Sequence, residues 1–273
     1  MKTLAKSAVI ATVAGMIVAG AQAQTSVTNN NSIITVNASS PLGMTAWSVG
    51  GTSILSQQSF YYQYGVNPGA PISSIPLSSV SSTGSTITTT YANSSFSLSI
   101  FYSLAGGSLS SGVSDISEQI TIQSLNNTVL NGFRFYQFAS FIGAGNVDLT
   151  QNPRNSLYTD AYVANSLMNV SESVDTGLTP GANLAETDAN ALMNAMGGAN
   201  LDGSTTSTLG LWALQWNENI AAGGTVIISK DLNAMVPVPE PSTWALFSLG
   251  LGVVALQVYR RRAVKVLAPV KIK

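Results

Sequence analysis

Polar and apolar residues alternate along most of the chain, and three stretches show this pattern most clearly. In residues 95–102, Phe96, Leu98, Ile100 and Tyr102 take every second position, and Ser97 and Ser99 take the other face. Residues 116–123 repeat the pattern with isoleucines, and residues 211–216 repeat it with tryptophan and leucine. A period of two residues is typical of strands that bury one face and expose the other.

The same reasoning predicts further strands, separated by short turns rich in Gly, Asn and Pro. These strands are predicted at residues 32–36, 43–49, 59–64, 85–91, 132–138, 158–163, 167–174 and 224–230. Many short strands with turn signals between them indicate an antiparallel sandwich. The predicted fold class is therefore all-β, an antiparallel β-sandwich or jelly-roll-like body.

One segment departs from the alternating pattern. In residues 179–196 the apolar positions recur at helical spacing, from Leu184 to Ala195, before Gly197 and Gly198. Paired glycines are a common stop signal for a helix. The sequence predicts one short helix here, packed on or linking the sheets.

The N-terminus carries a secretory signal peptide, predicted at residues 1–23. Lys2 and Lys6 form its charged start, an Ala-rich apolar core follows, and Ala21 and Ala23 form the small-residue cleavage site. Cleavage leaves Gln24 as the new N-terminus. The exported body is then expected to span residues 24–236.

The C-terminus has three parts in a fixed order: Pro239, Glu240 and Pro241, then an apolar run, then Arg260, Arg261 and Arg262. Proline restricts the backbone and keeps this turn extended. The apolar run predicts a transmembrane helix at residues 243–259. Trp244 and Tyr259 would anchor it at the membrane interfaces, with the arginines on the cytoplasmic side.

This arrangement resembles the PEP-CTERM sorting signal of exported proteins of Gram-negative bacteria; the resemblance is confined to residues 238–262, and the sorting signal is predicted to span residues 237–262. The resemblance implies recognition by an exosortase, a membrane transpeptidase, with cleavage near Pro239, Glu240 and Pro241. It implies a membrane-tethered intermediate that is then moved to the cell surface or extracellular matrix. Members of the family usually end soon after the arginines, whereas a basic tail of residues 263–273 follows here, predicted to be cytoplasmic. A permanent C-terminal membrane anchor is the alternative interpretation.

Charge within the body excludes one class of partner. Residues 24–238 hold three basic and eleven acidic residues, a formal charge of −8. Binding to nucleic acid depends on Lys and Arg contacts with phosphates. Nucleic acid is therefore excluded as a partner. The chain also contains no cysteine, so its fold has no disulfide framework.

The chain contains no histidine either, which restricts catalysis to carboxylates. Glu118 is the best candidate acid, because its alternation places it among isoleucines on an apolar face. A carboxyl group there could act as a general acid in a glycan hydrolase or lyase. The structural alternative is an edge position or a partner such as Arg134, with Asp115 capping a turn. We favour that alternative and predict no catalytic residue.

Calcium and sugar are the other possible ligands. Asp175, Glu186, Asp188 and Asp202 lie in or near the predicted helix and carry the oxygen ligands that calcium prefers. They form no complete calcium-loop motif, so no metal or cofactor is predicted. A sugar-stacking surface could be formed by aromatic residues, namely Trp47, Phe60, Tyr61, Tyr62, Tyr64, Phe133, Phe135, Tyr136, Phe138 and Phe141. Aromatic residues in strands more often pack in a core.

Together these features predict an exported structural or adhesive protein rather than an enzyme. The resemblance implies association with extracellular polysaccharide or biofilm matrix. A carbohydrate-binding module is the first alternative, and it requires exposure of Trp47, Tyr61 and Tyr62. A carboxylate-dependent glycan hydrolase or lyase is the second, and it requires two acids facing each other in a cleft.

Overall fold

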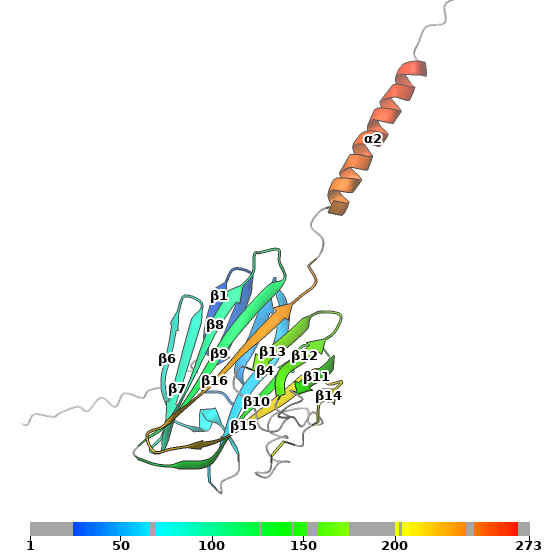
Figure 1. The fold of residues 1–273 in the computed structure, drawn as a ribbon. Helices are drawn as coiled ribbons and strands as arrows, with labels where there is room; N and C mark the ends of the chain where they lie inside the picture. Colours follow the sequence, from blue (N-terminus) through cyan, green and yellow to red (C-terminus); the bar gives the residue numbers. More distant parts are fainter. Residues whose placement is uncertain are drawn as a thin grey trace, which may run out of the picture.

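The computed structural model describes residues 24–65, 69–125, 127–143, 145–151, 158–174, 200–201, 204–238 and 243–266. Its described strands form two antiparallel sheets that pack face to face (Figure 1). The antiparallel sandwich predicted from the alternating pattern is confirmed. The short helix predicted at residues 179–196 lies outside the described residues.

The first sheet has seven strands. Its order is β1 (Gln24–Asn29), β2 (Ser32–Asn37), β3 (Gly43–Val49), β4 (Thr52–Gln63), β10 (Leu130–Phe141) and β15 (Leu211–Ile220), with β5 (Ala70–Pro71) paired to β4. A single turn of 3-10 helix, Ile72–Ser74, follows β5. Sequence neighbours β1 to β4 form a meander, and β10 and β15 extend it from far along the chain.

The second sheet has nine strands. Its order is β14 (Thr206–Ser207), β11 (Asn146–Gln151), β12 (Tyr158–Ala164), β13 (Asn169–Val174), β16 (Thr225–Met235), β9 (Val113–Ser124), β8 (Phe96–Gly106), β7 (Thr86–Ala92) and β6 (Leu77–Thr83). Each predicted strand corresponds to one of the strands in these two sheets. The alternating pattern did not identify β1, β6 and β11, whose residues are mostly polar, nor the two-residue strands β5 and β14.

The space between the sheets is filled by aromatic and branched side chains. Trp47, Trp212 and Trp216 of the seven-stranded sheet are fully buried, as are Phe96 and Tyr102 of the nine-stranded sheet. Buried polar atoms join the sheets at defined points. Trp47 Nε1 donates a hydrogen bond to Ser114 Oγ at 3.1 Å, and the Tyr91 hydroxyl donates to the Ala38 carbonyl at 2.8 Å.

A long helix, α2 (Thr243–Val266), follows the sandwich and extends away from it (Figure 1). It includes the predicted helical residues 243–259 and runs farther. Among the described residues, however, no helix combines the length and apolar character that a membrane span requires. The prediction of a transmembrane helix at residues 243–259 is therefore not confirmed by the described residues.

Candidate functional site

A cluster of three charged side chains lies between the two sheets. Glu118 of β9, Lys230 of β16 and Glu172 of β13 come from neighbouring strands of the nine-stranded sheet. All three side chains point toward the opposite sheet, and none of them is exposed to solvent. A buried charge is costly unless it is paired, so the arrangement of these three groups matters for the whole fold.

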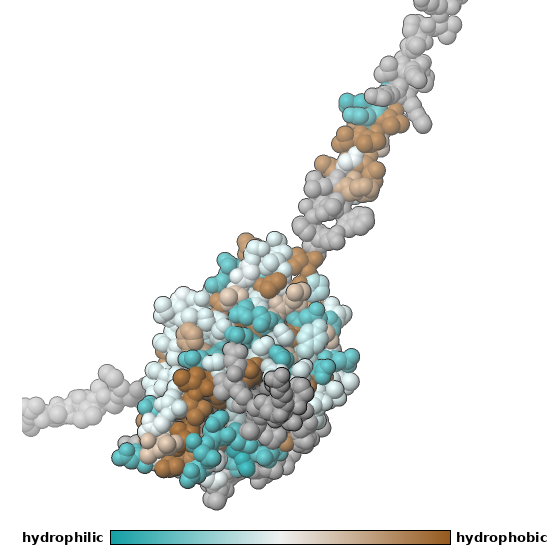
Figure 2. All heavy atoms as spheres, in the orientation of Figure 1, coloured by the Kyte–Doolittle hydropathy of each residue, from teal (hydrophilic) through white to brown (hydrophobic). Residues whose placement is uncertain are grey.

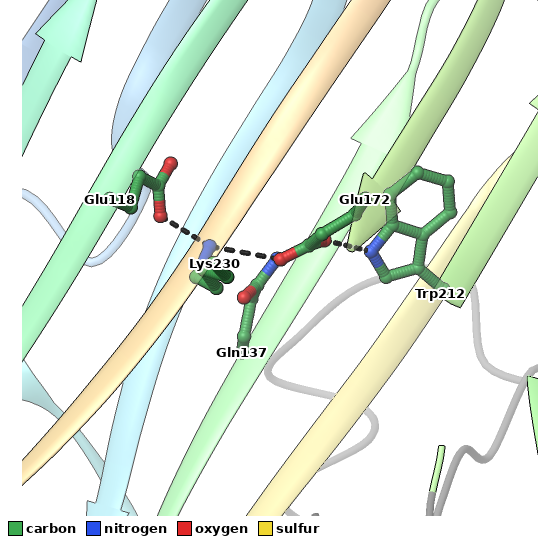
Figure 3. Close-up of polar contacts among 5 residues, drawn as sticks. All are labelled: Glu118, Gln137, Glu172, Trp212 and Lys230. Atoms are coloured by element: carbon green, nitrogen blue, oxygen red, sulfur yellow. Dashed lines mark hydrogen bonds and ion pairs between the residues drawn. The ribbon is translucent and has the colours of Figure 1, made fainter. Parts of the chain in front are cut away.

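Strand register brings the charges together. Lys230 lies directly opposite Glu118 in the antiparallel pairing of β16 with β9. Lys230 Nζ contacts Glu118 Oε2 and lies 3.0 Å from Glu172 Oε1, so one ammonium group bridges two carboxylates (Figure 3). With all three groups ionised, the cluster carries one net negative charge.

The seven-stranded sheet completes the surroundings of the cluster. Gln137 Nε2 of β10 donates a hydrogen bond to Glu172 Oε2 at 2.8 Å, and Trp212 Nε1 of β15 donates to the same oxygen at 2.6 Å (Figure 3). Lys230 Nζ also lies 5.4 Å from the centre of the Phe60 ring. The two sheets are therefore joined through Glu172 by hydrogen bonds from Gln137 and Trp212.

Burial and the neighbouring charges set the ionisation of the cluster. Burial raises the pKa of Glu118; Lys230 lowers it and the Glu172 carboxylate raises it, and the net shift is upward. Burial also opposes the charged form of Lys230, but Glu118 and Glu172 together outweigh it and raise the pKa of Lys230. Lys230 therefore stays charged at neutral pH, and Glu118 takes up a proton more readily than an ordinary exposed glutamate does.

This geometry does not suit the chemistry of a glycan hydrolase. Two acids and a lysine are present, but their side chains are sealed between the sheets, with no exposed atom for a substrate to reach. A depression of about 220 Å³ lies over this part of the sheet, and its lining includes Glu118 and Lys230 beside the outward-facing residues Phe101, Ser117, Gln119, Ser229 and Asp231. The side chains of Glu118 and Lys230 nevertheless have no solvent-exposed surface, so the depression does not open onto their charged groups. We conclude that the cluster fixes how the sheets pair and pack.

A pH dependence of stability follows from the acidic groups. Burial raises the pKa of Asp115, Glu118 and Glu218, and for Asp115 the nearby Asp231 adds to the effect. The folded state then holds these protons more tightly than the unfolded state does. We expect the free energy of unfolding of residues 24–236 to fall as pH rises from about 4 toward neutral, measured by urea unfolding. Lys230 contributes no change there, because its pKa is raised above 10.5.

Glu118→Gln provides the control for this pH dependence. The variant removes the fully buried acid and leaves Lys230 paired with Glu172, so we expect the decline in stability with pH to become shallower. A wild-type protein that gains stability from pH 4 to 7 would contradict the pKa directions given above.

The sequence identified only part of this cluster. The prediction that Glu118 lies on the buried face is confirmed, but the edge position and the pairing with Arg134 are wrong. Strand β9 is central, and Arg134 donates a hydrogen bond to Gln63 Oε1 instead. The prediction that Asp115 caps a turn is also wrong, because Asp115 lies within β9, opposite Asn233.

Lys230 and Glu172 were missed, although a signal for both was present. Lys230 alternates with Ile228 and Leu232, and Glu172 lies between Val170 and Val174, so each shares a face with buried residues. The apolar residues on either side of a charged residue were used to predict its burial only for Glu118. Applied to all three positions, the same criterion would have placed each of the three side chains on a buried face, although not next to one another.

The aromatic residues proposed as a sugar-stacking surface belong to the core. Trp47 and Tyr61 are buried, and Tyr62 is half-buried. The Tyr62 ring packs against Phe96 at 5.4 Å and against Phe133 at 6.3 Å between ring centres. The hypothesis of an exposed row formed by Trp47, Tyr61 and Tyr62 is therefore wrong, because these rings fill the space between the sheets.

Several predicted site residues lie outside the described residues. They are Ala21, Ala23, Pro239, Glu240, Pro241 and the four acids that could bind calcium, Asp175, Glu186, Asp188 and Asp202. Among the residues that the structure does describe, no cluster of three or more acidic groups could hold a metal ion. Tyr259 and Arg260 are exposed on α2.

The C-terminal segment is similar to a known protein-sorting motif. Residues 237–263 match the family model of the PEP-CTERM protein-sorting motif. The chain therefore carries a PEP-CTERM sorting signal, of the kind recognised by an exosortase-type sorting enzyme. The matched segment begins directly after Val236, the last buried residue of the sandwich.

Solved structures show what the sandwich is similar to. A crystal structure of a bacterial glucoamylase complexed with acarbose matches with a TM-score of 0.57 and 8% identity, over 82% of this chain and 34% of that chain. A structure described as a putative kojibiose phosphorylase from the human microbiome matches with a TM-score of 0.36 and 6% identity, over 87% of this chain and 29% of that chain. No curated protein matches the sequence.

The likeness to the glucoamylase is a likeness of fold alone. This chain spans about a third of that protein, and the identity is 8%. A two-sheet architecture of this kind is used by proteins of many functions. The glucoamylase match therefore confirms the sandwich and assigns no activity to it.

Proposed function

We propose that this protein is a structural or adhesive component of the cell surface or extracellular matrix of a Gram-negative bacterium. In this proposal an exosortase-like enzyme sorts the chain at the membrane, and the sandwich is the part that reaches the matrix and associates with extracellular polysaccharide. The sorting motif at residues 237–263 is the observation that carries the proposal.

The exposed helix α2 supports sorting at the membrane. Its described apolar side chains are exposed, and those of Phe247, Leu249 and Leu256 are each more than half exposed. Figure 2 shows them along the helix, away from the sandwich. Apolar surface on all sides of a helix is normally covered by protein or lipid. A lipid environment during sorting would cover it.

The sealed charge cluster supports a non-catalytic role. Acid–base catalysis requires a proton-transferring group within hydrogen-bond reach of its substrate. Glu118 and Glu172 instead make their contacts with Lys230, Gln137 and Trp212 inside the sandwich. We therefore expect the wild-type protein to show no turnover on a panel of polysaccharides, and turnover that Glu118→Gln abolishes would overturn this part of the proposal.

Intact mass of the protein from membrane, surface and medium fractions tests the sorting. We expect a surface or medium species that begins at Gln24 and ends near the Pro239–Pro241 motif. Replacing Pro239, Glu240 and Pro241 by alanine should move the protein to the membrane fraction as a species ending at Lys273. Pro237→Ala, which changes a proline of the matched segment outside Pro239, Glu240 and Pro241, is the matched control and should be sorted like the wild type.

The fractions also distinguish the alternative. A wild-type species that ends at Lys273 and remains entirely in the membrane fraction would indicate a permanent anchor. In that case the sorting proposal fails, and the sandwich would act at the membrane face.

A further inference from the structure

The first part of the exported body contains no charged side chain. From Gln24 to Ser114 there is no Asp, Glu, Lys or Arg, and the charges of the body begin at Asp115. This part forms strands β1 to β8, and it includes β6, the edge strand of the nine-stranded sheet. Natural proteins commonly protect an exposed edge with charged residues, proline or a covering element.

Strand β6 is exposed on both of its faces. Six of its seven residues are exposed and Val80 is intermediate, whereas β7 and β8 alternate between buried and less buried positions. Among the described strands β6 pairs with β7 only, and it lies at the outer end of its sheet (Figure 1). The facing edge strand, β1, packs against β7 and β8. Contacts within one molecule therefore leave most of the side-chain surface of β6 uncovered.

The sequence of β6 suits antiparallel pairing with a second copy of the same strand. Leu77–Thr83 reads LSSVSST, with Val80 at its centre and hydroxyl side chains on both sides of it. In an antiparallel pair of two β6 strands about a twofold axis, Val80 faces Val80 and Ser79 faces Ser81. Hydroxyl pairs across strands can hydrogen-bond, and no like charges meet.

We propose that β6 is a self-association edge, at which two copies of the exported body pair and join their nine-stranded sheets. The inference deepens the proposed matrix role and rests on it for its biological setting. A second copy fits better than another partner for two reasons. The uncharged edge offers nothing to an oppositely charged protein, and two bodies of formal charge −8 can approach here without facing charges.

The expected interface is small, which sets the conditions for observing it. A single pair of seven-residue strands buries less than the roughly 1,000 Å² typical of a stable interface. Pairing should therefore be weak in dilute solution. Copies held on one membrane or in one matrix have a high effective concentration, and this strengthens a weak contact.

Single cysteines test the pairing cleanly, because the full chain contains no cysteine of its own. Val80→Cys places a thiol at the centre of the proposed twofold axis. We expect oxidation of membranes carrying this variant to give a strong disulfide-linked dimer, seen on a non-reducing gel. Ser117→Cys, exposed on the central strand β9, is the matched control and should give only background dimer.

Register and charge provide two further readouts. Coexpressed Ser79→Cys and Ser81→Cys should crosslink to each other more than either variant does to itself. Adding Ser81→Lys to Val80→Cys should abolish the dimer while the thermal unfolding of the protein stays unchanged. Equal dimer from Val80→Cys and Ser117→Cys, in a protein that folds normally, would overturn the inference.

The crosslinking and sorting results are independent. A protein that is sorted but does not crosslink through β6 rejects the self-association edge alone. A protein that crosslinks through β6 but keeps its C-terminus in the membrane rejects the sorting proposal alone.

Discussion

Replacing Lys230 by methionine is expected to cause a large loss of stability in the sandwich. The variant leaves Glu118 and Glu172 buried together without the ammonium group that bridges them. Removing one partner from a buried ion pair typically costs about 3–5 kcal/mol. Urea unfolding of residues 24–236 at pH 7 measures the loss, and this segment contains all the described strand pairings.

Two further measurements separate the loss of charge from the loss of packing. Lowering the pH should restore part of the stability of Lys230→Met, since protonation neutralises the two remaining carboxyl groups. The neutral triple variant with Glu118→Gln, Lys230→Met and Glu172→Gln should be close to the wild type, because buried ion clusters add little compared with neutral groups of similar size. A triple variant as unstable as Lys230→Met would show that packing, rather than unpaired charge, causes the loss.

Strand positions in this protein could be predicted from the sequence because most of its strands bury one face. The alternation of apolar and polar residues in β8, β9 and β15 reflects that burial directly. It fails for β6, because a strand exposed on both faces has no apolar face to detect. Strand β6, for which we propose a partner, is thus one of the strands that the alternating pattern does not reveal.

Pairing between strands could not be predicted in the same way. Lys230 and Glu118 are far apart in the sequence and meet only because β16 lies next to β9 in the sheet. Local periodicity assigns each residue to a face but does not give the order of the strands. The same limit explains why the sequence alone suggests Arg134, also in a strand, as the partner of Glu118.

The sorting signal could be identified for a different reason. Its function depends on a short linear order of residues, and so it is read directly from the sequence at residues 237–263. The sandwich carries no comparable local motif. Its role must therefore be derived from surfaces and packing, such as the exposed edge β6 and the sealed cluster around Lys230.

Replacing Phe133 by alanine is expected to cause the second large loss of stability. Phe133 of the seven-stranded sheet packs edge-on against Phe96 of the nine-stranded sheet, with 5.2 Å between ring centres. Tyr62 and Tyr64 pack against the same two rings. Truncating a buried phenylalanine to alanine typically costs about 3–5 kcal/mol, because the cavity that remains is only partly refilled. Thermal and urea unfolding of residues 24–236 measure the effect.

Phe101→Ala is the matched control, because Phe101 lies on the outer face of β8 and is 38% exposed. Phe101→Ala should lower the free energy of unfolding by far less than Phe133→Ala does, since removing an exposed ring leaves no cavity in the core. The comparison also decides between two roles for the aromatic residues. If Phe133→Ala kept full stability but lost binding to a polysaccharide, the aromatic cluster would be a ligand surface. A large loss of stability for Phe133→Ala alone assigns the cluster to the core, so any polysaccharide must bind the hydroxyl-rich exterior instead.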